Sequence, residues 1–281
     1  MKLLPPHPWR IPVIILFVCL VLYTALALFL YFTQERHVYF PTRPIGATPE
    51  YVGIAYERVS FRSADNIVLT GWFVGVSRPR GTILFCHGNG GNISYLLETV
   101  KLFSALEYNL LVFDYRGYGE SDGTPTEEGT YLDAEAAWDY LVKQRGILPS
   151  SIVLMGRSLG GGVATWLAQR HAPQALILES TFTSLADIAA EVYPYFPVRW
   201  LLRFRYSTLD RIADVRCPVL VIHSRADEIV SFRHGWALFA AAREPKVFLE
   251  IQGGHNEGFL ISADRYAAGI KDFLARQTAG M

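Results

Sequence analysis

The chain has 281 residues, of which 51% are hydrophobic and 14% aromatic, so it can bury one large core or two small ones. Its 26 basic and 26 acidic residues give a formal net charge of zero, and the basic residues are spread along the chain. This composition excludes a disordered chain. The balanced and dispersed charges give no basic patch of the kind that binds nucleic acid.

The first element that the sequence predicts is a transmembrane helix. Residues 11–32 form an apolar run of 22 residues without a charge. At about 1.5 Å per residue, such a helix can cross a hydrocarbon core of roughly 30 Å. Two alternatives stay open: a signal peptide cleaved after Ala27, or a lipoprotein site at Cys19. The run continues past Ala27, and Val18 is too large for the position before a lipidated cysteine, so we expect an uncleaved anchor behind a short flank, residues 1–10.

The charges on either side of the apolar run predict its orientation. Lys2 and Arg10 precede it, and Arg36 and Arg43 follow it. The counts are almost equal under the positive-inside rule, but the first group is more compact, so we expect a cytoplasmic N-terminus and a C-terminal domain outside the cytoplasm. Residues 33–55 are rich in proline, and we expect a short tether that keeps the domain within about 25 Å of the bilayer.

Residues 56–281 alternate short apolar runs with amphipathic segments such as residues 94–107 and 129–145. Residues 57–61 and 67–76 predict an opening hairpin. Six further apolar runs predict buried strands: residues 82–88, 110–115, 151–156, 175–180, 218–224 and 246–251. This order predicts an α/β fold, with a mostly parallel eight-stranded sheet and helices on both faces.

Two stretches match the G-x-S-x-G pattern, Gly119–Gly123 and Gly156–Gly160. Ser158 ends a strand run and opens a helical segment, which is the arrangement that presents a nucleophilic serine above a sheet. The flanking glycines leave room for the sharp turn that this requires. A Gly-Thr-Pro sequence comes soon after Ser121, so no helix can begin there. We therefore expect Ser158 to be a nucleophile and Ser121 to be a turn residue.

A serine hydroxyl needs a base to become a nucleophile, and for this kind of turn the base is a histidine late in the chain. His255 lies on a glycine-flanked loop after the last strand run. His223 lies within an apolar strand run and His234 within a helical segment, where a structural histidine is the better interpretation. We expect His255 to be the base.

The acid that orients the histidine is expected between the serine and the histidine in the chain. Asp227 lies on the loop after the strand run 218–224, and the next strand run leads to His255. Glu228, directly beside it, and Glu179, one strand run earlier, are alternatives. We expect Asp227 to be the acid.

The stretch His87–Asn92 follows an early strand run and precedes a helical segment. Its backbone N–H groups can therefore point at the carboxyl edge of the sheet and bind an oxyanion, and we expect the donors to be Asn89 and Leu159. A phosphate-binding loop is the alternative, but Ile93 stands where a dinucleotide fingerprint needs glycine and no Walker lysine follows. We expect His87 to fix this loop.

Five motifs now stand in one order along the chain: HGNGGN, DYRGYGESDG, GRSLGG, HSRADEIV and GGHNEG. Over about residues 50–277 the sequence resembles the α/β-hydrolase superfamily. Within it, the chain is similar to a branch of membrane-anchored, small-capped proteins that includes protein depalmitoylases and bacterial relatives. The resemblance implies a bacterial inner-membrane protein with a catalytic triad of Ser158, Asp227 and His255, and oxyanion donors at Asn89 and Leu159.

Residues 181–209 lie between two strand runs and predict a small cap rich in aromatic and basic residues. One interpretation is an amphipathic helix packed on the sheet. The other is an acyl pocket with a basic rim, or a patch on anionic lipid, with Tyr193, Phe196 and Trp200 as substrate-binding residues.

We therefore expect a serine hydrolase that cleaves carboxylic esters or thioesters of lipid or acylated substrates. A serine peptidase or aminopeptidase is an alternative, because the same fold and triad serve amide hydrolysis. A binding protein that keeps the fold without catalysis is another. Cys86 and Cys217 lie in or beside apolar runs, and neither metal-ligand spacing nor a disulfide framework is present, so we expect no metal and no organic cofactor.

Overall fold

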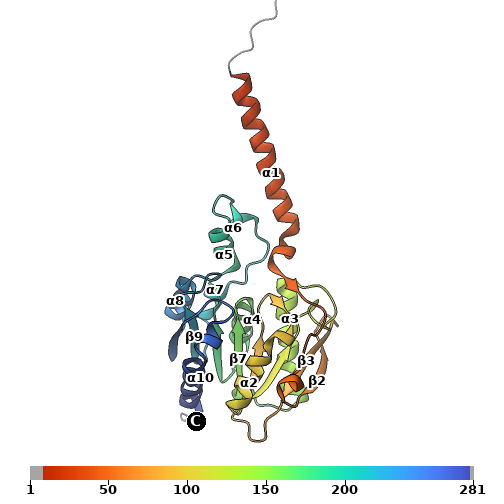
Figure 1. Ribbon diagram of the computed structural model, residues 1–281, viewed down its shortest axis with the longest axis vertical. Coiled ribbons are helices and arrows are strands. Elements are labelled where there is room, and N and C mark those ends of the chain that lie inside the picture. The colour runs from red at the N-terminus through yellow and green to blue at the C-terminus, as the bar shows by residue number, and fades with distance from the viewer. Residues whose placement is uncertain (1–8, 279–281) are drawn as a thin grey trace, which may run out of the picture.

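In this computed structural model, which describes residues 9–278, one long helix projects from an α/β domain (Figure 1). The helix α1 (Arg10–Val38) contains the predicted transmembrane segment, and its most apolar window has a mean hydropathy of 3.0 and is not buried. It is the one helix among residues 9–278 that is long and apolar enough to cross a membrane, a criterion that a signal sequence would also meet. Residues 1–8 of the predicted flank lie outside the described residues.

The segment predicted as a tether, residues 33–55, differs from that expectation. Residues 33–38 continue α1, because their charged and polar side chains end an apolar span without ending a helix. Tyr39 is buried, and β1 (Phe40–Pro41) pairs in parallel with β5 (Gly90–Gly91). A 3-10 turn, η1 (Pro49–Val52), follows. The segment therefore holds the end of α1 against the domain.

The sheet has eight strands in the order β10-β9-β8-β7-β4-β6-β3-β2. The strands are β2 (Glu57–Arg62), β3 (Val68–Val74), β4 (Thr82–Cys86), β6 (Asn109–Phe113), β7 (Ile152–Arg157), β8 (Ala175–Glu179), β9 (Val219–Ser224) and β10 (Lys246–Ile251). The six strands from β10 to β6 are parallel, and the hairpin of β2 and β3 joins them in antiparallel fashion. The predicted α/β fold with a mostly parallel eight-stranded sheet is confirmed.

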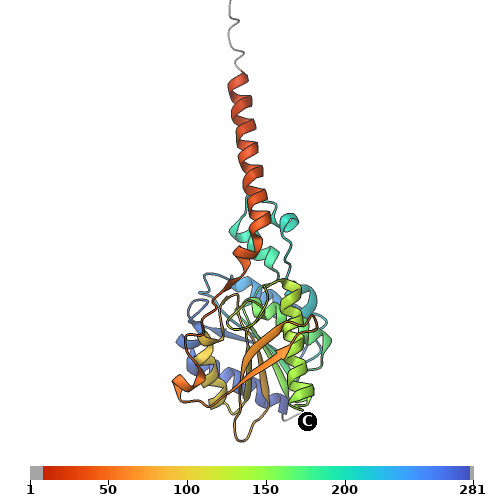
Figure 2. The same cartoon turned by 90° about the vertical axis from the view of Figure 1, so that its right-hand side faces the viewer.

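Helices cover both faces of the sheet, and each face has its own apolar cluster (Figure 2). One cluster contains α3 (Glu127–Asp139), α4 (Leu159–Arg170) and α8 (Phe232–Ala241), and the other contains α2 (Leu97–Ala105) and α10 (Ala263–Thr278). The shorter helical turns are η2 (Ile93–Leu96), the π-helical η3 (Tyr140–Gln144), η4 (Pro149–Ser151) and α9 (Gly258–Ile261). Strands β4, β8 and β9 are buried along their whole length because both faces are covered.

The chain between β8 and β9 forms the cap, which contains α5 (Leu185–Val192) and α6 (Val198–Leu201) and leads into α7 (Thr208–Ile212). Both views place α5 and α6 beside the end of α1 that joins the domain (Figures 1 and 2). No residue of α5 or α6 is buried. The two cap helices therefore bury no residue fully, although Leu185 and Ile188 of α5 pack against the apolar cluster that contains α3, α4 and α8.

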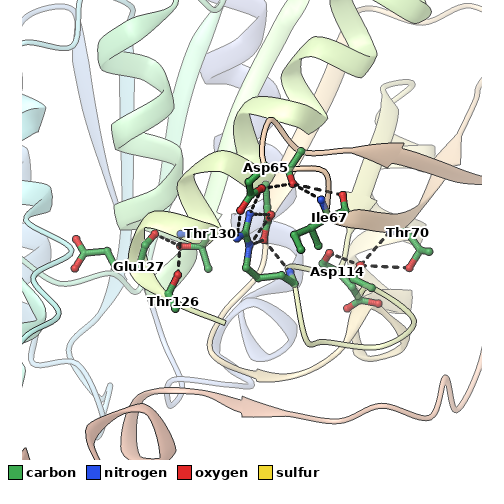
Figure 3. A network of polar contacts seen from close by, with 12 residues as sticks. Asp65, Ile67, Thr70, Asp114, Thr126, Glu127 and Thr130 are labelled. Carbon is green, nitrogen blue, oxygen red and sulfur yellow. Dashed lines mark hydrogen bonds and ion pairs between the residues drawn. The ribbon is translucent and has the colours of Figure 1, made fainter. Parts of the chain in front are cut away.

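The loop after β6 is held by a buried arginine. Arg116 makes ion pairs with Asp65 (Nη1 to Oδ2, 2.7 Å) and with Asp133 (Nη2 to Oδ1, 2.8 Å), in the network of Figure 3. Burial raises the pKa of Asp133 to about 6, although Arg116 opposes this shift. The loop is thus tied both to the turn after β2 and to α3.

Candidate active site

Ser158 occupies the turn between β7 and α4, at the carboxyl edge of the sheet. Its backbone is in a strained conformation, with φ 53° and ψ −122°. A Cβ atom at Gly156 would overlap the carbonyl oxygen of Gly160, and one at Gly160 would overlap the carbonyl oxygen of Cys86. The two glycines therefore allow the close approach that presents the Ser158 hydroxyl.

Three residues predicted from the sequence meet in one chain of hydrogen bonds. The Ser158 hydroxyl lies 3.1 Å from His255 Nε2. On the other side of the ring, Nδ1 lies 2.9 Å from Oδ2 and 3.0 Å from Oδ1 of Asp227. When Nδ1 carries a proton and donates it in a hydrogen bond to the Asp227 carboxylate, Nε2 has a free lone pair to accept the serine proton.

The Asp227 carboxylate is held by backbone donors. Oδ1 accepts the N–H groups of Ile229 (3.0 Å) and Val230 (2.8 Å). Burial raises the pKa of Asp227, but the hydrogen bond from His255 and these N–H groups outweigh it and hold the pKa below its usual range. The carboxylate is therefore ionised at neutral pH.

The alternatives for the base lie elsewhere in the described structure. His223 donates from Nε2 to the Val230 carbonyl (2.8 Å), and burial lowers its pKa. His234 contacts Glu191 (2.5 Å) beneath the cap. His171, which also follows Ser158 in the chain, contacts Glu135 (2.8 Å). None of the three has a hydrogen bond to Ser158.

The alternatives for the acid also have other partners. Glu179 makes an ion pair with Arg157 (3.0 Å) and accepts the Tyr266 hydroxyl (2.6 Å). Glu228 accepts the backbone N–H of His255 (3.1 Å) and not its ring. Of the three candidates, Asp227 is the one whose carboxylate contacts the ring of His255.

Ser121 is fully buried, and its hydrogen bonds join the loop after β6 to strand β3. Its hydroxyl donates to the Asp114 carbonyl (2.7 Å) and accepts the Thr70 N–H (3.0 Å). Figure 3 shows Thr70 and Asp114 close together in this network. A hydroxyl with both partners taken, and with no path to solvent, has no place for a substrate carbonyl.

Asn89 and Leu159 line the same cavity as Ser158. This cavity, called the serine cavity below, has a volume of about 750 Å³ and is lined by residues 37–38, 40, 42, 87–92, 95–96, 98, 157–159, 182, 185, 188, 229–230, 255–256 and 259–260. An added Cβ at Gly88 would lie 3.6 Å from the Ser158 Cβ, so the loop passes directly beside the serine. Backbone N–H groups on that loop are therefore within reach of a substrate bound at Ser158.

His87 holds this loop from below. Its Nδ1 donates to the Gly88 carbonyl (2.7 Å), and its ring lies against Tyr115 with a centroid distance of 4.3 Å. Burial lowers the pKa of His87 to about 4, so the ring is neutral. The geometry fits the loop-fixing role expected for His87.

A second cavity lies between α1 and the cap. This cap groove has a volume of about 210 Å³ and is lined by Ala27, Leu30, Tyr31, Gln34, His37, Val38, Leu185, Ile188, Ala189, Val192, Tyr193, Phe196, Val198, Leu201 and Leu202. Tyr193 and Phe196, predicted to bind substrate, thus lie in the cap groove and not in the serine cavity. Trp200 lines neither cavity, and its side chain is 91% exposed.

The contribution of α1 to the site was not predicted from the sequence. His37 and Val38, inside the predicted tether, line both cavities. One feature of the sequence could have indicated it. Residues 33–38 contain neither proline nor glycine, so no residue that usually ends a helix follows Phe32 directly. Among residues 9–278, no cluster of three or more His, Cys, Asp or Glu side chains could hold a metal ion.

Known proteins are similar to this chain in sequence and in fold. Residues 81–205 match the family described as "alpha/beta hydrolase fold". The chain is 38% identical over 252 residues to an uncharacterized protein of Mycobacterium tuberculosis, covering 88% of this chain and 89% of that one. It is 35% identical over 270 residues to the alpha/beta hydrolase domain-containing protein WAV2 of Arabidopsis thaliana, covering 86% and 88%.

A search of solved structures agrees at the level of the fold. The esterase Pf2001 of Pyrococcus furiosus matches with a TM-score of 0.70 at 20% identity, covering 85% of this chain and 97% of that one. At this identity the likeness concerns the fold alone. Together with the relatives in sequence, it leads to one conclusion: the chain belongs to the α/β-hydrolase family.

Proposed function

We propose that the protein is a membrane-anchored serine hydrolase that cleaves carboxylic esters or thioesters of lipid or acylated substrates. The observation that carries the proposal is the hydrogen-bonded chain from Ser158 through His255 to Asp227 on the wall of an open cavity. Such a chain activates a serine for acyl transfer, whatever the fold that holds it.

In the first step, the Ser158 oxygen attacks the acyl carbonyl while His255 Nε2 takes its proton. Asp227 keeps the ring in the tautomer that leaves Nε2 free, and its charge stabilises the imidazolium that forms. The oxyanion of the tetrahedral intermediate accepts hydrogen bonds from the N–H groups of Asn89 and Leu159. His255 then gives the proton to the leaving alcohol or thiol, and an acyl-enzyme on Ser158 remains.

In the second step, His255 takes a proton from a water molecule, and the resulting hydroxide attacks the acyl-enzyme. The tetrahedral intermediate collapses, the proton returns to Ser158, and the carboxylic acid leaves. All the groups that this cycle needs are supplied by the chain itself.

The membrane anchor is supported by the length of α1 and by its apolar surface. The most apolar stretch of this helix is not buried against the domain. We place the N-terminus in the cytoplasm of a bacterial cell and the hydrolase domain on the outer side of the inner membrane, on the charge distribution of the flanks. A domain held at a bilayer meets substrates that partition into it, which favours lipid or acylated molecules over small soluble esters.

Labelling with a fluorophosphonate probe tests this function. In detergent-solubilised protein we expect labelling of the wild type and of Ser121→Ala, and none of Ser158→Ala. Labelling that survives Ser158→Ala would overturn the assignment of the nucleophile, and an unlabelled wild type would favour a non-catalytic binding protein. A matched panel of ester, thioester and amide substrates then separates the proposed activity from that of a peptidase.

A further inference from the structure

The transmembrane helix and the cap are bound to each other. Tyr23 of α1 stacks on Phe196 of the cap, with ring centroids 5.0 Å apart. The Gln34 side chain donates to the Leu201 carbonyl (2.9 Å) and accepts the Arg203 N–H (2.8 Å). Contacts at Tyr23 and Gln34 span three turns of α1, so the cap follows the helix for about 16 Å.

The cap groove between them is apolar on both walls. Leu30 and Tyr31 line it from α1, and Ile188, Ala189 and Val192 line it from the cap. Its volume of about 210 Å³ exceeds the roughly 150 Å³ at which an apolar protein cavity binds benzene. The groove therefore has the size and chemistry for a stretch of alkyl chain.

The groove adjoins the serine cavity. His37, Val38, Leu185 and Ile188 line both cavities. An alkyl chain lying in the groove therefore has only these four side chains between it and the cavity that contains Ser158.

The position of the groove along α1 places it at the membrane. The apolar run ends at Phe32, and Tyr23 lies nine residues earlier, about 13 Å deeper at 1.5 Å per residue. Since one leaflet contributes about 15 Å of hydrocarbon, the cap tip that touches Tyr23 reaches the acyl-chain region of the near leaflet. Trp200 and Tyr195, exposed by 91% and 87%, give this tip an aromatic outer surface.

We propose that the cap groove takes the fatty-acyl chain of a lipid ester directly from the near leaflet and guides its carbonyl to Ser158. This inference rests on the function proposed above and names its substrate class. It makes α1 one wall of the acyl site as well as an anchor. Each methylene buried in such a groove favours binding by up to about fourfold, so the groove selects long chains.

Two alanines of α1 give a matched test. Ala27 lines the groove, whereas Ala25 is exposed and lies about 200° away around the helix. With protein in phospholipid vesicles, kcat/KM is measured for p-nitrophenyl palmitate and p-nitrophenyl butyrate. The ratio of the two should fall at least tenfold in Ala27→Trp and stay unchanged in Ala25→Trp. Equal ratios in the two variants would overturn the proposal.

A binding experiment separates the groove from the chemistry. Ser158→Ala protein in the same vesicles is irradiated with palmitic acid that carries a mid-chain diazirine. Crosslinks should map to residues 27–38 and 185–202, and Ala27→Trp should reduce their yield severalfold while Ala25→Trp does not. Crosslinks elsewhere, or equal yields, would refute the groove, even in a protein that hydrolyses esters.

Two further outcomes distinguish the proposed hydrolysis from the proposed acyl groove. If wild type hydrolyses neither ester but crosslinks in the groove, the proposed hydrolysis is wrong and the acyl site stands. If the enzyme cleaves a palmitoylated peptide in solution faster than a palmitoyl lipid ester in vesicles, supply of substrate from the bilayer is wrong.

Discussion

The sheet and the cap of this protein are held in place by different means. Strands β4, β8 and β9 are buried along their length between two apolar clusters, and the turn at Ser158 is fixed by backbone contacts. The helices α5 and α6 bury no residue fully. At its base, the cap depends on the Glu127 carboxylate, which accepts the N–H groups of Arg205 (2.5 Å) and Tyr206 (2.8 Å).

This difference suggests a division of labour. The sheet fixes the positions of Ser158, His255 and Asp227, which the acyl transfer that we propose requires. The cap is attached by polar contacts, by α1 and by partly buried apolar side chains such as Leu185 and Ile188, so we expect it to adapt to a substrate more readily than the sheet does. We therefore expect changes at the carboxyl edge of the sheet to remove chemistry or fold, and changes in the cap to alter selectivity.

Replacing His255 should give the largest effect. His255→Ala should lower turnover by roughly 10⁴ to 10⁶, about 5.5 to 8 kcal/mol of transition-state stabilisation, because serine and histidine act as a unit. Steady-state kinetics on an ester substrate measures this, and circular dichroism checks the fold. The control is His171→Ala, whose turnover should stay within about twofold of wild type. A loss below tenfold in His255→Ala would show that another group takes the serine proton.

Removing the ion pairs of Arg116 should lower the stability of the sheet and its covering helices rather than alter catalysis. Arg116→Leu leaves Asp133, which is fully buried, without its partner, and we expect a loss of about 3–5 kcal/mol in the free energy of unfolding. Asp65 is 42% exposed, so Asp65→Asn should cost about 1 kcal/mol or less. Denaturant titration of both variants in detergent measures the difference. Because Arg116→Leu removes both ion pairs, equal losses would mean that the pair with Asp65 accounts for the whole effect and that the pair with Asp133 contributes nothing.

Asp114 should make the sheet side sensitive to pH. Burial raises its pKa to about 7, and one of its carboxylate oxygens has no hydrogen-bond partner in the described structure. Because the folded pKa lies above the ordinary value near 4, the folded state binds more protons between these pH values. The contribution of Asp114 to stability is therefore highest below about pH 4, falls as the pH rises, and levels off above about pH 7.

Asp114→Asn removes this titrating group, so the comparison of variant and wild type gives the pH-dependent contribution of Asp114 alone. The difference in the free energy of unfolding between variant and wild type should shift by about 2–4 kcal/mol in favour of the variant from pH 4 to pH 8. Denaturant titrations across this range provide the measurement. A difference that does not vary with pH would show that Asp114 is ionised throughout.

Much of the sheet side follows from local patterns in the sequence. Continuous apolar runs predict the buried strands. The glycines around Ser158 indicate a turn in which other residue types would overlap the backbone. Asp227 and His255 could be chosen because loops after parallel strands gather at one edge of the sheet. The meeting of all three residues thus depends on the order of strands and loops, which the sequence carries.

The cap side could not be read in the same way. Trp200 was chosen by residue type, but in so short a helix nothing in the sequence tells which side faces the groove. The end of α1 was assigned from its first charges, yet Gln34 is buried because the cap packs on it from 167 residues away. A contact of that range depends on tertiary packing, which leaves no local periodicity behind.

Gln34 gives the smallest predicted effect and the most direct test of the division. Gln34→Ala removes two hydrogen bonds between α1 and the cap, each worth about 1 kcal/mol. Thr33→Ala, one residue earlier, also removes two hydrogen bonds, but both lie within α1. Limited proteolysis within residues 193–204 should accelerate several-fold in Gln34→Ala and not in Thr33→Ala, while the midpoint of global unfolding stays the same. If the global midpoint falls with Gln34→Ala, cap and sheet unfold as one unit. The cap would then be as rigid as the sheet, and selectivity would have to arise within a fixed site.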